Sequence, residues 1–165
     1  MIGIIIVILA IVIIIVIIAR RLPDAREKLG QARQVSSEEI SLIGLIAQAD
    51  EAFDRKEYEK AESIYVKAAS QDPDNSKIYS RLGAIYLEQR NFYDARDAFL
   101  QAAKIEPDLA SRHMNLGVAY TGLKDYFKAG ESFKKALALD PKNKKYRNLL
   151  ERAERAQKTH KNNNT

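Results

Sequence analysis

Residues 2–19 form an uninterrupted apolar run. None of these eighteen residues is charged, eleven are Ile, and Arg20 and Arg21 follow directly. As a helix rising 1.5 Å per residue, the run would span roughly 27 Å, close to the hydrocarbon thickness of a bilayer. A cleaved signal peptide is the alternative, but no basic segment precedes the run, and its apolar core is longer than is usual for such peptides. We therefore predict an uncleaved transmembrane anchor at residues 1–19.

Positive charges flank the predicted anchor on its downstream side. Lys and Arg are enriched on the cytoplasmic flanks of membrane helices, so the rest of the chain is predicted to face the cytoplasm. The Ile-rich anchor and the compact layout favour the plasma membrane of a bacterium as the location of this single-pass protein. The downstream cations are Arg20, Arg21, Arg26, Lys28 and Arg33.

Beyond the anchor, the hydrophobic and small residues recur with a period of 34 residues. Residues 76–109 and 110–143 match at eight positions, and residues 42–75 keep four of them as Ala61, Tyr65, Ala68 and Pro73. A fixed period of this length indicates an array of repeated supersecondary units. The eight positions hold Tyr79, Leu82, Gly83, Tyr86, Ala95, Phe99, Ala102 and Pro107 in the first block, and His113, Leu116, Gly117, Tyr120, Ala129, Phe133, Ala136 and Pro141 in the second.

This pattern resembles the tetratricopeptide repeat family over residues 42–143. The resemblance implies an all-α fold, a right-handed superhelix of three helix-turn-helix repeats. We expect Gly83 and Gly117 to let the two helices of a hairpin approach closely, and the three Pro residues to end each second helix. The recurring aromatic residues are expected to pack in the core rather than to form a ligand site.

The remaining segments are assigned from their patterns. Residues 144–158 carry one apolar stripe between charged positions, which predicts the polar-faced capping helix that a solenoid requires. Residues 159–165 are predicted to be a disordered polar tail. Residues 20–41 are predicted to be a juxtamembrane linker that is helical in part, with a capping box at residues 36–39 opening the first repeat helix. The repeats are 42–75, which is degenerate, 76–109 and 110–143.

Helical spacing predicts which face of each repeat is open. Positions 7, 8 and 11 of the first helix pack inside the hairpin, so positions 2, 5, 9 and 12 face the other way. The resemblance implies that this second face lines a concave groove. The groove positions are Ile43, Ile46, Asp50 and Phe53 in the first repeat, Lys77, Ser80, Ala84 and Leu87 in the second, and Ser111, Met114, Val118 and Thr121 in the third.

The predicted groove is mostly apolar, which suits a partner protein that offers an amphipathic helix or an apolar peptide. Family members that clamp a C-terminal carboxylate use Lys and Asn where this chain has Ile46 and Asp50, so the resemblance disfavours that function. In the alternative interpretation, the chain's own juxtamembrane or capping helix covers the groove. The candidate binding residues are Ile43, Ile46, Asp50, Phe53, Lys77, Ala84, Leu87, Met114 and Val118.

Charge changes sign along the repeats. The formal charge is −4 over residues 42–75, 0 over 76–109, +3 over 110–143 and +5 over 144–165. A solvated helix face explains this gradient most simply. The alternatives are head-to-tail self-association into a homo-oligomer and binding of anionic lipid or nucleic acid, although no nucleic-acid motif supports the last of these. The candidate basic patch is Lys144, Lys145, Arg147, Arg152 and Arg155.

The sequence offers no catalytic chemistry. It has no Cys and two His, of which His113 occupies a position that is aromatic in the family, while His160 lies in the predicted tail. Phosphate-binding loops, paired-His metal motifs and nucleophile elbows are absent from the sequence. We therefore predict a non-enzymatic, membrane-tethered scaffold with no catalytic residue, metal or cofactor.

Overall fold

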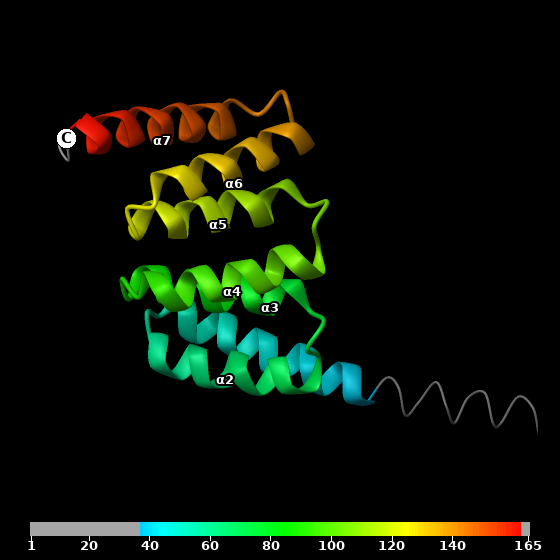
Figure 1. Cartoon of the computed structure of the whole chain (residues 1–165). Helices are drawn as coiled ribbons and strands as arrows, with labels where there is room; N and C mark the ends of the chain where they lie inside the picture. Colours follow the sequence, from blue (N-terminus) through cyan, green and yellow to red (C-terminus); the bar gives the residue numbers. More distant parts are fainter. Residues whose placement is uncertain (1–36, 163–165) are drawn as a thin grey trace, which may run out of the picture. The chain divides into compact units, whose positions relative to one another are not determined.

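The computed structural model describes residues 37–162, and this part of the chain consists of helices joined by short turns (Figure 1). This confirms the predicted all-α class. The chain divides after Ile43 into two compact units, and the unit from Gly44 to Thr165 contains the paired helices. The helices cover residues 37–54, α2 Tyr58–Gln71, α3 Ser76–Glu88, α4 Phe92–Ile105, α5 Ala110–Gly122, α6 Tyr126–Leu139 and α7 Lys144–Asn162.

The helices of the second unit pack in sequence order. α3 packs on α4 and α5 on α6, which makes two helical hairpins, and α4 packs on α5 to stack one hairpin on the next. α7 lies along α6 at the end of the stack (Figure 1). Each helix contacts mainly its neighbours in the chain, which is the arrangement of a repeat solenoid.

Local sequence signals explain where the helices begin and end. The side chains of Asn75, Asn91 and Asp125 each accept a hydrogen bond from a backbone N–H in the first turn of the helix that follows. α2, α4 and α6 each end two residues before a Pro. Because Pro has no N–H and disfavours a helical residue before it, it stops each second helix, as the sequence predicted.

An aromatic ring from each second helix fills the core of its hairpin. Tyr65, Phe99 and Phe133 occupy the same repeat position and are fully buried. A Cβ atom added at Gly83 would lie 2.6 Å from Cε1 of Phe99, and the equivalent distance from Gly117 to Phe133 is 2.5 Å. The two glycines therefore permit the close helix approach that the sequence predicted, and the partner in each case is a phenyl ring.

Two segment boundaries differ from the prediction. α7 continues to Asn162, so residues 159–162 are helical and do not belong to a disordered tail. The Thr159 hydroxyl donates to the carbonyl oxygen of Arg155 at 3.1 Å, and the His160 ring lies edge-on to Tyr126 with centroids 6.0 Å apart. His160 and Lys161 also place positive or polarisable groups at the negative end of the helix dipole. At the other end, residues 37–41 of the predicted linker are already helical.

The predicted anchor at residues 1–19 lies outside the described residues, as does the linker through residue 36. Among the helices of residues 37–162, none combines the length and the apolar character needed to cross a membrane.

Candidate protein-binding groove

The face predicted to line the groove is open to solvent in the structure. At the inward positions of α3 and α5, Leu82 and Leu116 are buried. At the predicted groove positions, Leu87, Met114 and Val118 are half-buried. These three apolar side chains are thus partly accessible to solvent, as they would be on a shallow binding surface.

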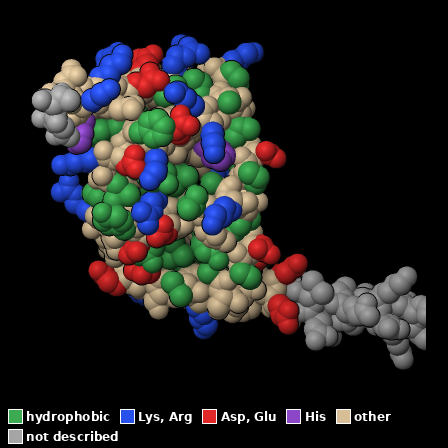
Figure 2. All heavy atoms as spheres, in the orientation of Figure 1, with side chains coloured by type: hydrophobic (Ala, Val, Ile, Leu, Met, Phe, Trp, Pro, Cys, Tyr) green, Lys and Arg blue, Asp and Glu red, His purple; other side chains and the backbone are tan. Residues whose placement is uncertain are grey.

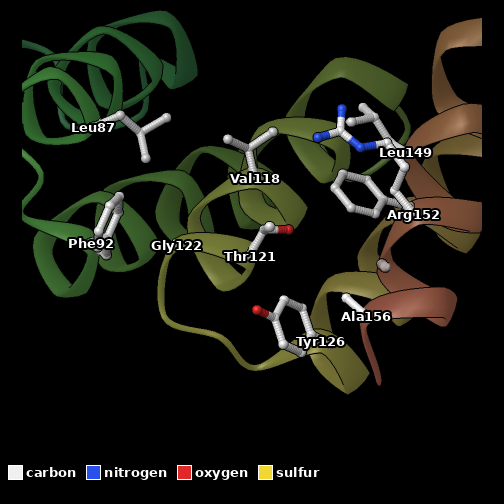
Figure 3. Close-up of a pocket in the computed structure, with 11 residues that line it drawn as sticks. Leu87, Phe92, Val118, Thr121, Gly122, Tyr126, Leu149, Arg152 and Ala156 are labelled. Atoms are coloured by element: carbon white, nitrogen blue, oxygen red, sulfur yellow. The ribbon is translucent and has the colours of Figure 1, made fainter. Parts of the chain in front are cut away.

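A hollow of about 550 Å³ lies on this face, between the second repeat and α7. This volume falls within the range of roughly 300–1,000 Å³ that is usual for ligand sites. Figure 3 shows Leu87 and Phe92 on one side, Leu149, Arg152 and Ala156 on the other, and Val118 and Thr121 between them. The lining residues are Leu87, Phe92, Val118, Thr121, Gly122, Tyr126, Phe133, Leu149, Arg152, Ala153 and Ala156.

The hollow is built on rigid packing. Ala129, Phe133 and Ala153 form a buried cluster beneath it, against which Met114 and Val118 pack. At the opposite wall a Cβ atom at Gly122 would lie 2.2 Å from Cδ1 of Phe92, so only glycine lets that ring lie against α5. The apolar surface is therefore held in place by residues that cannot move without disturbing the core.

One cation reaches this apolar surface. The guanidinium of Arg152 extends from α7 toward the α5 side of the hollow (Figure 3). Within residues 37–162 no carboxylate forms an ion pair with it, and three acids of α7 and of the turn before α6 pair with other cations. Glu151 lies 3.6 Å from Arg155, Glu154 lies 3.9 Å from Lys134, and Asp125 lies 3.2 Å from Lys128.

Asp50, one of the predicted groove residues, also has partners within the chain. Its Oδ1 atom accepts a hydrogen bond from the Tyr65 hydroxyl at 2.5 Å and lies 3.0 Å from Nε of Arg81. Burial of Tyr65, together with this hydrogen bond to Asp50, raises the pKa of the Tyr65 hydroxyl well above its usual value. Asp50 therefore links the first and second repeats, because Tyr65 belongs to the first repeat and Arg81 to the second.

Five further candidate binding residues lie outside the lining of the hollow, namely Ile43, Ile46, Phe53, Lys77 and Ala84. Ile43 belongs to the first unit and is 64% exposed, and Lys77 is exposed in the first turn of α3. Ile46 and Ala84 are half-buried, and Phe53 stands edge-on to Tyr58 with centroids 5.7 Å apart. Of the nine candidates, Leu87 and Val118 line the hollow, and Met114 packs on the cluster beneath it.

The five residues of the predicted basic patch lie on one broad side of α7 and have different partners. By helical spacing they spread over roughly 160° of α7. Arg152 lines the hollow, Arg147 donates to the carbonyl oxygen of Pro141 at 3.1 Å, and Arg155 pairs with Glu151. Lys144 and Lys145 are exposed in the first turn of the helix. On the face shown in Figure 2, Lys and Arg side chains are dense over α7 and the adjoining hairpin.

Sequence reasoning missed several residues of the hollow. Phe92 and Tyr126 occur at the same repeat position and were assigned to the core, and Leu149 and Ala156 were assigned to the packing stripe of α7. Ser80, at a groove position, has a buried hydroxyl without a hydrogen-bond partner in the described part of the chain.

The described residues show no metal centre. No group of three or more His, Asp or Glu side chains within residues 37–162 is placed to hold a metal ion. A ring nitrogen of His113 lies 2.7 Å from the carbonyl oxygen of Pro107, which gives this residue a structural role at the turn before α5. The absence of catalysis and cofactors stays a prediction.

Comparisons with known proteins agree with this architecture. Two family models described as tetratricopeptide repeat match residues 52–117 and 110–143, which together exceed half of the chain. No curated protein sequence matches significantly.

Solved structures from distant organisms share the fold. The second tetratricopeptide domain of human RPAP3, in complex with the HSP70 peptide SGPTIEEVD, has a TM-score of 0.67 and 21% identity, covering 71% of this chain and 98% of that chain. The Sgt2 domain from Aspergillus fumigatus has a TM-score of 0.67 and 25% identity, with coverage of 76% and 83%. MamA from Desulfovibrio magneticus RS-1, residues 41 to the end, has a TM-score of 0.66 and 24% identity, with coverage of 73% and 68%.

Proposed function

The chain belongs to the tetratricopeptide repeat family, and on that premise we propose that it is a membrane-tethered scaffold that binds a partner protein through the groove. The observation that carries this proposal is the hollow lined by Leu87, Val118 and Leu149, an accessible apolar surface on a rigid base. Such a surface suits an amphipathic helix or an apolar peptide. The human RPAP3 domain, which has the same fold, is in complex with a peptide, and this supports a peptide as the class of ligand.

Tethering would supply the mechanism. Residues 1–19 have the length and composition of a membrane helix, and the cations from Arg20 to Arg33 favour a cytoplasmic position for the repeats. A tethered groove meets a membrane-associated partner at a high effective concentration, so an interaction of modest affinity suffices to recruit or assemble a complex there. The bacterial plasma membrane is the proposed location.

Site-specific crosslinking tests the groove. A photoreactive amino acid is placed at Met114, on the groove, or at the exposed Val66 of α2, which does not line the hollow. We expect specific adducts from Met114 in native membranes, lost when Leu87→Glu is added to a chain whose helicity is unchanged by circular dichroism. Equal adducts from both positions, or adducts that survive Leu87→Glu, would contradict groove binding.

The natural lack of Cys gives a clean test of tethering and orientation. A single Cys introduced at Lys56, in the exposed turn before α2, is the only thiol of the chain. We expect the protein to sediment with membranes, and an impermeant maleimide to label this Cys only after the cells are opened. Labelling in intact cells would show the opposite orientation, and recovery of the full chain in the soluble fraction would refute the anchor.

A further inference from the structure

We propose that the hollow recognises an acidic, amphipathic segment of the partner protein, with a bulky apolar side chain in the hollow and a carboxylate on Arg152. This inference rests on the proposed function and adds the chemistry of the peptide. Neither the predicted groove nor the predicted basic patch contained this combination, because Leu87 and Val118 belong to the repeats and Arg152 belongs to α7.

The apolar part of the site comes from four helices. Leu87 of α3, Phe92 of α4, Val118 of α5 and Leu149 of α7 surround a space supported by the buried ring of Phe133. Burial of a large apolar side chain in this space would remove apolar surface from water, which favours binding. The shape therefore favours a single bulky anchor such as Leu or Phe over a flat polar surface.

The charged part of the site is Arg152. Its guanidinium has no carboxylate partner within residues 37–162, and Asp125, Glu154 and Glu151 each pair with another cation. A guanidinium presents a planar fork of donors that matches a carboxylate, and an adjoining apolar wall strengthens the attraction by excluding water. A carboxylate from a partner would complete this local charge balance.

Two residues with hydroxyl groups, Thr121 and Tyr126, also line the hollow. Thr121 already donates to the carbonyl oxygen of Gly117 at 2.9 Å, which fixes its side chain and leaves its oxygen as an acceptor. The Tyr126 hydroxyl has no hydrogen-bond partner in the described part of the chain and lies at the rim of the hollow (Figure 3). Tyr126 can therefore donate to a backbone carbonyl of the bound peptide.

Helical geometry sets the spacing of the two recognition groups. On a helix, residues three or four positions apart lie on one face, with Cβ atoms about 5–6 Å from each other. A bound helix would thus place Asp or Glu three or four residues from its apolar anchor. A peptide with the apolar anchor alone, or with Lys at that spacing, should bind more weakly.

A charge-swap selection tests the proposal. The full-length chain is reconstituted in lipid nanodiscs, and random peptides displayed on phage are selected against wild type, Arg152→Glu and Arg155→Glu. Arg155 is the matched control, because it is the same residue type on the same helix but lies outside the lining of the hollow. We expect wild type and Arg155→Glu to enrich peptides with Asp or Glu near a bulky apolar residue, and Arg152→Glu to enrich Lys or Arg there.

Synthetic peptides from the selection then give affinities by fluorescence anisotropy. The loss of a charge-assisted contact in Arg152→Glu should weaken binding about tenfold or more, and a peptide with its acidic residue changed to Lys should restore it. If the peptides require Leu87 but bind Arg152→Glu as well as wild type, the acidic specificity is wrong and the groove proposal stands. If binding is indifferent to Leu87→Glu, or if no peptide is enriched, both proposals fail.

Discussion

At the scale of single residues, glycine and an aromatic ring share one space in each full repeat. The Phe133 ring lies where a side chain at Gly117 would be, and Phe99 does the same at Gly83. Both rings are fully buried, Phe99 against the next hairpin and Phe133 against α7, so neither can withdraw without opening a cavity. The distance between the two helices of a hairpin therefore depends on having glycine, which has no Cβ atom, at this position.

A pair of Gly→Ala substitutions measures this effect. Gly117→Ala should lower the free energy of unfolding by about 1–3 kcal/mol through overpacking against Phe133. Gly44→Ala should instead raise it by about 0.5–1 kcal/mol, because helix propensity improves and the structure places nothing within 4 Å of the new Cβ atom. Urea unfolding followed by circular dichroism gives both values. Equal effects of the two substitutions would show that close packing at Gly117 is unimportant.

A polar network joins the second and third repeats where the repeat pattern is broken. Arg112 occupies the repeat position of the buried Ile78 and is itself only 8% exposed. Its guanidinium donates to Glu106 at 2.7 Å and to Ser76 at 2.9 Å, and the Ser76 hydroxyl donates to Glu106. The hydrogen bond from Ser76, and then that from Arg112, hold the pKa of the Glu106 carboxyl below its usual value.

The network should make stability depend on pH. The pKa of Glu106 is lower in the folded state than its ordinary value of 4.5. The ionised carboxylate therefore contributes fully to the free energy of unfolding above pH 4.5, and this contribution is lost as the pH falls below that value toward the pKa of the folded state. We expect wild type to be more stable than Glu106→Gln at pH 7 and this difference to shrink between about pH 5 and pH 3. Urea titrations across this range measure it. A difference that is constant with pH would mean that the ionised carboxylate contributes nothing.

At the scale of elements, the sequence was sufficient to predict the helices but not to predict which residues line the hollow. The period of 34 residues located each hairpin, since Gly, Pro and the buried aromatics recur with it, and helical spacing identified the open face that holds Leu87 and Val118. The position of α7 has no repeat to predict it, so the role of Arg152 beside the groove could not be inferred. The hydrogen bond from Tyr65 to Asp50 could not be inferred for a similar reason, because it joins side chains from two separate helices.

α7 should stabilise its neighbour and have little effect beyond it. Ala153 is 3% exposed against Phe133, so Ala153→Glu places an unpaired charge in the buried cluster. Because the energy of a solenoid is dominated by contacts between neighbours, hydrogen exchange should accelerate in α6 and α7 and much less in α3. The exposed neighbour Glu154→Ala is the control and should leave exchange almost unchanged. Uniform acceleration across the unit would show that it unfolds as a whole.

At the scale of the whole molecule, the charge gradient suggests head-to-tail assembly, but the described surfaces argue against it. The acidic first repeat uses part of its charge internally, since Glu51 pairs with Arg55 at 2.6 Å and Glu57 with Lys60 at 2.9 Å. The large exposed apolar side chains of the described residues include none on α7. Exposed ion pairs contribute little, and stable interfaces need an apolar centre, so opposite net charges alone are a weak basis for a homo-oligomer.

We therefore expect one protomer in each particle at every ionic strength. Sedimentation of the full chain in detergent micelles should give the same protein mass per micelle in low and high salt. A charge-reversed variant, Lys144→Glu with Lys145→Glu, should have the same protein mass per micelle as wild type. If the two ends attracted each other, this variant would lose that attraction and the two proteins would differ. A larger species that forms at low salt and disappears in the variant would establish head-to-tail contact, and the basic end of α7 would then bind a second copy of the chain.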